Sequence, residues 1–268
     1  MSASSLPLRR RYLRHVHRII HPPRRPVRDP QISRLVLRLP HWPAGLAGLR
    51  VAQISDIHYG LYLPGSLAER AVEMTNRLQP DLIALTGDFV TSSRQFVEPV
   101  SELLGCLRAP LGIYAVLGNH DFRVGAELVT RGLRRHGIRV LRNTYRALGL
   151  AGGQVRIAGI DDSRQRPDLR AALGPARGRP FTLLLAHSPA ALDDAAAAKV
   201  DLVLSGHTHG GQIHLRFADA LFDRYWPAGL LQKDETRMYI SRGLGKVILP
   251  WRIHCPPEVT LFTLYPHS

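Results

Sequence analysis

The sequence has few cysteines and no long apolar run. Its 268 residues include only two cysteines, Cys106 and Cys255. This number is too small for a disulfide framework, and the two are not spaced as in a zinc knuckle, so we expect free thiols in a reducing compartment. No stretch approaches the roughly 18 consecutive apolar residues of a membrane-spanning helix, and the basic-then-apolar order of a secretory signal is missing at the start. We therefore expect neither a disulfide-stabilised secreted domain nor an integral membrane protein.

Acidic residues are scarce at the N-terminus. Residues 1–50 hold eleven arginines and one acid, Asp29, in a chain whose formal net charge is +15. Apolar residues spaced by three and four positions predict an amphipathic helix over residues 6–21, which Pro22 and Pro23 would end. We therefore expect a basic arm over residues 1–48, with peripheral contact to an anionic membrane through residues 1–40.

Two other interpretations of the arm stay open. It could be a solvated or disordered tail whose few apolar residues pack on the domain. It could also bind nucleic acid, but residues 1–40 contain a single aromatic residue, Tyr12, and therefore lack a surface on which bases could stack. Nucleic acid is the less favoured partner for this reason. No obligate protein partner is indicated.

Beyond Leu49 the chain alternates short apolar runs with amphipathic segments, which predicts an α/β domain over residues 49–268. Strand–helix–strand order implies a mainly parallel sheet, and later hairpins imply a second, more antiparallel sheet packed against it. The expected strands are 50–55, 82–85, 113–117, 140–148, 155–160, 181–186, 202–204, 238–241 and 259–264. The expected helices are 66–78, 97–107, 126–136 and 189–198.

Polar residues directly follow five of these apolar runs. In open α/β sheets, ligands bind outside the carboxyl ends of the strands, so these residues are expected to meet at one edge. The five motifs are Asp56-Ile57-His58, Gly87-Asp88, Gly118-Asn119-His120-Asp121, His187 and Gly206-His207-Thr208-His209-Gly210-Gly211.

The residue types in these motifs indicate metal binding. Imidazole, carboxylate and amide oxygen without thiolate are hard-to-borderline ligands for divalent ions. Seven of these residues exceed the needs of one tetrahedral site and suit two ions that share a carboxylate: Asp56, His58, Asp88, Asn119, His187, His207 and His209. Each motif alone is more often a turn, a cap or a solvated loop, and the metal prediction rests on all five occurring in this order.

These motifs resemble the calcineurin-like metallophosphoesterase family over about Leu49–Leu264. The resemblance implies a four-layer α/β/β/α sandwich of two mixed sheets. The Gly-His-Thr-His-Gly-Gly-Gln-Ile form is similar to a bacterial branch often preceded by a membrane segment, in whose place this sequence has the basic arm. That branch is linked to lipid-type phosphodiester substrates, including UDP-2,3-diacylglucosamine.

The resemblance also implies residue roles. Asp88 would bridge two ions, and His120 would be the general acid. Many members have an acidic residue three positions after the bridging aspartate, where this sequence has Thr91, so Asp121 or a backbone carbonyl would have to orient His120. One ion would be held by Asp56, His58, Asp88 and His209, and the second would be completed by Asn119, His187 and His207.

We therefore expect a dinuclear metal-dependent phosphoesterase that uses manganese, iron or zinc and hydrolyses a phosphodiester or pyrophosphate bond, in lipid metabolism, by metal-activated water. The alternatives are a UDP-2,3-diacylglucosamine hydrolase of lipid A synthesis, a nucleic-acid phosphodiesterase and a non-catalytic metal-binding scaffold. The expected location is the bacterial cytoplasm, on the inner face of the plasma membrane.

Overall fold

The structure, a computed structural model, describes residues 29–60, 63, 65–175, 179–211, 226–247, 252 and 254–267. Two six-stranded sheets form its centre. In spatial order, the first sheet consists of β1 (Gln31–Leu39), β12 (Glu258–Pro266), β2 (Leu49–Ile54), β3 (Leu82–Leu85), β4 (Ile113–Ala115) and β5 (Arg139–Val140). The second consists of β10 (Gly229–Lys233), β11 (Thr236–Ile240), β9 (Leu202–Ser205), β8 (Phe181–Leu185), β7 (Gly153–Gly159) and β6 (Thr144–Leu150).

Parallel pairing dominates both sheets, as the strand–helix–strand order predicts. In the first sheet only the β12–β2 pair is antiparallel. In the second sheet β7, β8, β9 and β11 are parallel, and antiparallel neighbours lie at its two edges, β6 and β10. The second sheet is thus the more antiparallel of the two. Because β2, β3, β4, β8 and β9 are inner strands, their carboxyl ends are brought together rather than left at an outer edge.

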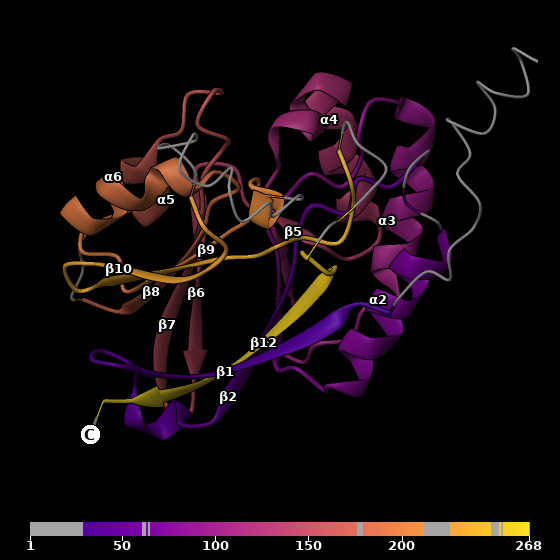
Figure 1. Ribbon diagram of the computed structural model, residues 1–268. Coiled ribbons are helices and arrows are strands. Elements are labelled where there is room, and N and C mark those ends of the chain that lie inside the picture. The colour runs from indigo at the N-terminus through magenta and orange to yellow at the C-terminus, as the bar shows by residue number, and fades with distance from the viewer. Residues whose placement is uncertain are drawn as a thin grey trace, which may run out of the picture.

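Helices cover the outer face of each sheet, which gives the expected four layers (Figure 1). The first sheet is covered by α2 (Gly65–Arg77), α3 (Val97–Gly105) and α4 (Asn119–Arg135), and the second by α5 (Leu169–Leu173) and α6 (Leu192–Ala197). Single 3-10 turns lie at Ala44–Leu46, Arg94–Phe96, Pro189–Ala191 and His209–Gly211.

The largest apolar side chains are buried between these layers. Leu37, Val51, Leu82, Phe181 and Phe262 belong to one cluster between the two sheets. Two further clusters lie between each sheet and its helices. Burial on both faces explains why the inner strands are nearly continuous apolar runs.

The predicted boundary of the arm at residue 48 is wrong in one respect. Residues 31–39 form β1, which pairs in parallel with β12 along nine residues. Leu37 and Leu39 are buried between the sheets, whereas Arg34 and Arg38 are exposed on the edge strand. The arginines obscured the alternating apolar pattern of a strand, and the charge count assigned the segment to the arm. The predicted helix over residues 6–21 lies outside the described residues.

Within the described part of the chain, no helix combines the length and apolar character that crossing a membrane requires.

Candidate metal centre

The carboxyl ends of β2, β3, β4, β8 and β9 bring the predicted site residues together. Asp56 and His58 follow β2, Asp88 follows β3, Asn119 and His120 begin α4 after β4, His187 follows β8, and His207 and His209 follow β9. These residues form three groups, and within each group the potential ligand atoms all lie within 4.8 Å of one another. The groups are Asp56, His58 and His209; His58, Asp88 and His120; and Asp88, His187 and His207.

The backbone at these positions is unusual. Among the described residues, eleven non-glycine residues have a positive φ, and five of these are Asp56, His58, Asp88, His207 and His209, with φ between 48° and 72°. Such conformations are uncommon for residues with a side chain and cluster at functional sites, where the surrounding structure holds them. The loops after the strands therefore adopt uncommon backbone conformations that direct these side chains toward one another.

Close backbone approach demands glycine next to two of these residues. A Cβ atom at Gly118 would overlap the carboxylate of Asp88, and a Cβ atom at Gly206 would overlap Ser55 Oγ and the carboxylate of Asp56. Neither glycine has a positive φ, so the requirement is for space.

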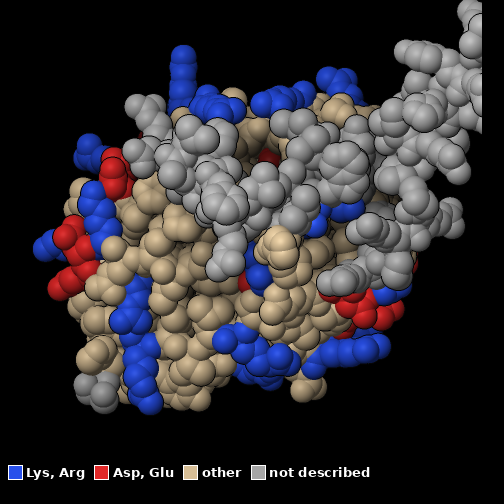
Figure 2. Space-filling model, viewed as in Figure 1, with Lys and Arg blue, Asp and Glu red and all other residues tan. Residues whose placement is uncertain are grey.

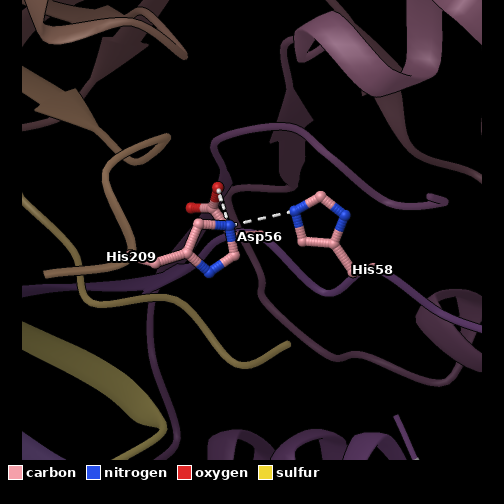
Figure 3. Close-up of side chains that lie close together, drawn as sticks. All are labelled: Asp56, His58 and His209. Carbon is pink, nitrogen blue, oxygen red and sulfur yellow. Dashed lines mark hydrogen bonds and ion pairs between the residues drawn. The ribbon is translucent and has the colours of Figure 1, made fainter. Parts of the chain in front are cut away.

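Asp56, His58 and His209 converge on one point (Figure 3). The Nε2 atoms of His58 and His209 lie 3.1 Å apart, and His209 Nε2 lies 3.5 Å from Asp56 Oδ1. Ligand atoms that are each about 2.1 Å from one ion in octahedral or tetrahedral geometry are separated by roughly 3.0–3.4 Å. The spacing of these three side chains therefore fits a divalent cation.

Asp88 lies between two sets of histidines. Its Oδ2 atom is 3.4 Å from His58 Nε2 and 3.3 Å from His187 Nε2, and His187 Nε2 lies 3.1 Å from His207 Nδ1. Its other oxygen, Oδ1, accepts a hydrogen bond from the backbone N–H of His120 at 2.9 Å. One oxygen of Asp88 is thus held by the backbone while the other faces both histidine sets.

The side chain of Asn119 gives independent evidence for a metal site. Its side chain is 6% exposed, and its buried Oδ1 atom has no hydrogen-bond partner among the described residues. A buried amide oxygen without a partner is costly, and native structures rarely contain one without a reason. A metal ion would satisfy it, so the residues present fit a metal better than they fit an empty polar core.

Burial and charge set the protonation of the imidazoles. Burial lowers the pKa of His58 to about 3, against the opposing effect of the Asp88 carboxylate, and burial also lowers the pKa values of His207 and His209. Neutral imidazole is the form that binds a metal. For His187, burial is outweighed by the charge of Asp88 and the contact with it, which raise its pKa to about 10. A bound cation would displace this proton from the His187 imidazole.

Hydrogen bonds of the remote ring nitrogens fix two histidines. The Nδ1–H of His187 donates to the carbonyl oxygen of Thr86 at 2.8 Å, and the Nδ1–H of His120 donates to the carbonyl oxygen of Thr91 at 2.7 Å. A carbonyl only accepts, so Nδ1 bears the proton in both rings and Nε2 faces the site. The backbone carbonyl, one of the two predicted substitutes for an acid at position 91, therefore orients His120.

Asp121, the other predicted substitute, has a different role. Its carboxylate accepts hydrogen bonds from the backbone N–H groups of Asp88, Phe89, Val90 and Gly118, at 2.8 to 3.3 Å. It therefore ties the loop after β3 to the start of α4. The motif suggested a site residue, but the sequence has no signal that distinguishes a loop anchor from a residue that contacts the site.

Sequence reasoning missed two other residues beside the site. Ser55 Oγ donates to Asp56 Oδ2 at 2.5 Å, and an Arg252 guanidinium nitrogen lies 3.3 Å from His209 Nδ1. The thiol of Cys255 donates to the carbonyl oxygen of His209 at 3.0 Å, so this buried cysteine supports the backbone of the site without facing it. An arginine almost 200 residues from the first motif has no spacing that links it to the centre.

Comparison with known proteins defines the class. The calcineurin-like phosphoesterase family matches residues 49–211, and the chain belongs to this family. It is therefore a metal-dependent hydrolase of phosphoesters.

Individual relatives agree with this class. The chain is 37% identical to the uncharacterized metallophosphoesterase YkuE of Bacillus subtilis over 235 residues, which cover 83% of this chain and 81% of the relative. It is 31% identical to the phosphodiesterase YaeI of Escherichia coli over 238 residues, which cover 85% and 86%.

A solved structure supports the fold. The 5′-nucleotidase precursor from Thermus thermophilus superposes with a TM-score of 0.50 at 19% identity, over 75% of this chain and 50% of that chain. The chain thus spans about half the length of that protein, and the likeness shows the sandwich architecture.

Proposed function

We propose that the chain is a phosphodiesterase with two divalent metal ions that share Asp88. The observation that supports it most is the position of Asp88 Oδ2, 3.4 Å from His58 Nε2 and 3.3 Å from His187 Nε2. A carboxylate oxygen equidistant from two histidine sets suits a bridge between two ions better than it suits a single site. The first ion would be held by Asp56, His58, Asp88 and His209, and the second by Asp88, Asn119, His187 and His207.

Two such ions, when bound, supply a water of lowered pKa and neutralise the phosphoryl oxygens. The chain's own residues supply the remaining requirements. Asn119 adds an oxygen without adding charge, which keeps the ions electrophilic. His120, whose Nδ1–H is held by the Thr91 carbonyl, presents Nε2 to the site and would protonate the departing oxygen.

Imidazole and carboxylate ligands without thiolate accept manganese, iron or zinc. Hydrolysis of bis(4-nitrophenyl) phosphate by protein loaded with manganese tests the proposal, with iron and zinc as parallel samples. We expect turnover that chelation abolishes and that Asp88→Asn reduces strongly. Full metal loading without hydrolysis of this diester, 4-nitrophenyl phosphate or UDP-2,3-diacylglucosamine would support a non-catalytic scaffold instead.

We further propose that the substrate is lipid-linked, with UDP-2,3-diacylglucosamine as one candidate, and that residues 1–40 contact the inner face of a bacterial plasma membrane. The junction with the arm supports this placement. The Gln31 N–H donates to Pro257 O at 2.7 Å, and an Arg242 guanidinium nitrogen contacts both Ser33 and Glu258. Arg242 is followed by Gly243, which packs against Asp56. Gln31, the first residue of β1, therefore lies at the same edge of the first sheet as the metal centre.

The exposed side of β1 supports the same contact. Arg34 and Arg38 are exposed there, and Val36 is 65% exposed, one of two large apolar side chains exposed among the described residues. In Figure 1, β1 lies in front and is not covered by α2 or α3, and Figure 2 shows Lys and Arg side chains along the lower part of the same face. Each basic residue near an anionic surface contributes about 1 kcal/mol.

Truncation tests the membrane proposal. The deletion must stop at residue 28, because one that extends to residue 40 would remove β1. We expect the shortened protein to hydrolyse a soluble ester normally but to co-sediment less with anionic vesicles and to turn over a lipid-embedded substrate more slowly. Equal vesicle binding by both proteins would contradict the proposal. Salt-sensitive DNA binding that the deletion removes would favour the nucleic-acid alternative.

A further inference from the structure

An open groove adjoins His207, which lies with His187 on one side of Asp88. It has a volume of about 590 Å³, and its lining includes His207, Thr208, Ser188, Pro189, Arg164 and Trp226. The lining residues come from the loops after β7, β8 and β9 and from the residue that precedes β10 by three positions. Because His207 belongs to the group formed with Asp88 and His187, a phosphate bound at the metal centre would lie at one end of this groove.

Arg164 is presented to the groove by a well-anchored turn. Asp162, which is 1% exposed, accepts hydrogen bonds from the backbone N–H of Arg164 at 3.1 Å through Oδ1 and from the N–H of Gln165 at 2.7 Å through its carbonyl oxygen. The Arg164 side chain is exposed, and its guanidinium has no ion pair or hydrogen bond within the described ranges. By contrast, the nearby Arg142 is paired with both Asp161 and Glu127.

The remaining lining limits what the groove would accept. Trp226 is half-buried and packs against the cluster between the second sheet and its helices, while another part of it lines the groove. Its indole and Pro189 form an apolar wall, whereas Ser163, Ser188 and Thr208 are polar. An acyl chain in this groove would desolvate the Arg164 guanidinium without a counter-ion, which is unfavourable. An anionic group joined to a ring or to a short apolar segment would pair with Arg164 and pack against Trp226 and Pro189.

We propose that this groove binds the part of the substrate beyond the scissile phosphate, and that this part has a second anionic group which Arg164 recognises. The proposal rests on the phosphodiesterase function proposed above and narrows its substrates to diesters or pyrophosphates with a further negative charge. Arg164 binds the substrate and takes no part in the chemical step, because the groove lies beside the metal centre and the turn that carries Arg164 contains no candidate metal ligand.

Two matched chromogenic diesters test it. Thymidine 5′-(4-nitrophenyl phosphate) and its 3′-phosphorylated derivative differ only in a second anionic group. We expect the wild-type protein to have the lower KM for the phosphorylated compound. Arg164→Ala should raise that KM about tenfold, the effect of losing one exposed charge-assisted hydrogen bond. The kcat values and the KM for the unphosphorylated compound should change by less than about twofold, and Arg164→Lys should have an intermediate KM.

Arg146→Ala is the control, because Arg146 is an exposed arginine on β6 that does not line the groove. It should leave both KM values unchanged. An Arg164→Ala effect that is absent or equal for the two diesters would overturn the proposal. Hydrolysis of both diesters would still stand in that case, so failure of the groove proposal is distinguishable from failure of the phosphodiesterase proposal. No metal-dependent hydrolysis of either diester would contradict both.

Discussion

Replacing His120 should impair hydrolysis in proportion to how much the leaving group needs a proton. The Thr91 carbonyl holds Nδ1–H of this ring, which leaves Nε2 as the only nitrogen able to deliver a proton at the site. A general acid contributes roughly 10²–10⁴-fold, or about 2.7–5.4 kcal/mol of transition-state stabilisation. We expect a loss of this size for an alkyl diester. A 4-nitrophenyl diester should lose less than about tenfold, because nitrophenolate departs without full protonation.

The substitution must be chosen with the packing of the site in mind. The His120 ring packs edge-on against His58, with ring centroids 4.8 Å apart, so alanine would leave a space beside a candidate ligand. His120→Asn is the better variant, because its amide N–H can still donate to the Thr91 carbonyl while the titratable ring is lost. His136→Ala is the control, since His136 instead contacts Glu98 on the surface of α3.

The assay compares kcat/KM for both diesters together with the metal content of each variant. His120 also belongs to a group of potential ligand atoms with His58 and Asp88, so its role as an acid has to be separated from metal binding. Metal content should be unchanged. Equal losses for the two leaving groups, or the loss of one ion per chain, would refute the assignment of His120 as the general acid.

Three further results are expected. Asp121→Ala should lower the free energy of unfolding in urea by about 3 kcal/mol, because the four buried backbone N–H groups that donate to this carboxylate lose their acceptor. An unfolding free energy equal to that of the wild type would show that the carboxylate does not anchor the two loops. Gly206→Ala should lower the free energy of unfolding by about 1–3 kcal/mol and reduce activity, because the added methyl group would overlap Asp56. Gly149→Ala is the control: the space around Gly149 is open, so stability and activity should not change. Equal effects of the two substitutions would contradict the steric argument. Chelation should lower the melting temperature, because an ion present at 100 times its Kd stabilises the native state by about 2.7 kcal/mol, and an unchanged melting temperature would count against structural metal binding.

The sequence was sufficient to predict the sandwich and the meeting of the site residues. Parallel inner strands are apolar on both faces, so a polar residue directly after such a strand stands out, and the five motifs follow from that contrast. Edge strand β1 was missed because only one of its faces is buried, and Arg34 and Arg38 on its exposed face gave the segment the appearance of an arm.

Contacts between distant segments could not be predicted. Arg252 lies near His209, and the Thr91 carbonyl orients His120, only because loops from different strands fold over the same edge. The sequence therefore predicts which side chains meet better than it predicts what orients them. The groove beside His207 has the same origin, since its lining comes from four segments that have no common pattern.

Metal stoichiometry tests the central claim most directly. The wild-type protein and Asp88→Asn should be loaded with manganese, freed of excess ion and analysed for bound metal per chain, with electron paramagnetic resonance to detect spin coupling between neighbouring ions. The position of Asp88 between two histidine sets predicts two coupled ions in the wild type and the loss of both from Asp88→Asn. One ion per fully loaded wild-type chain, or two uncoupled ions that persist in Asp88→Asn, would contradict the shared-carboxylate centre.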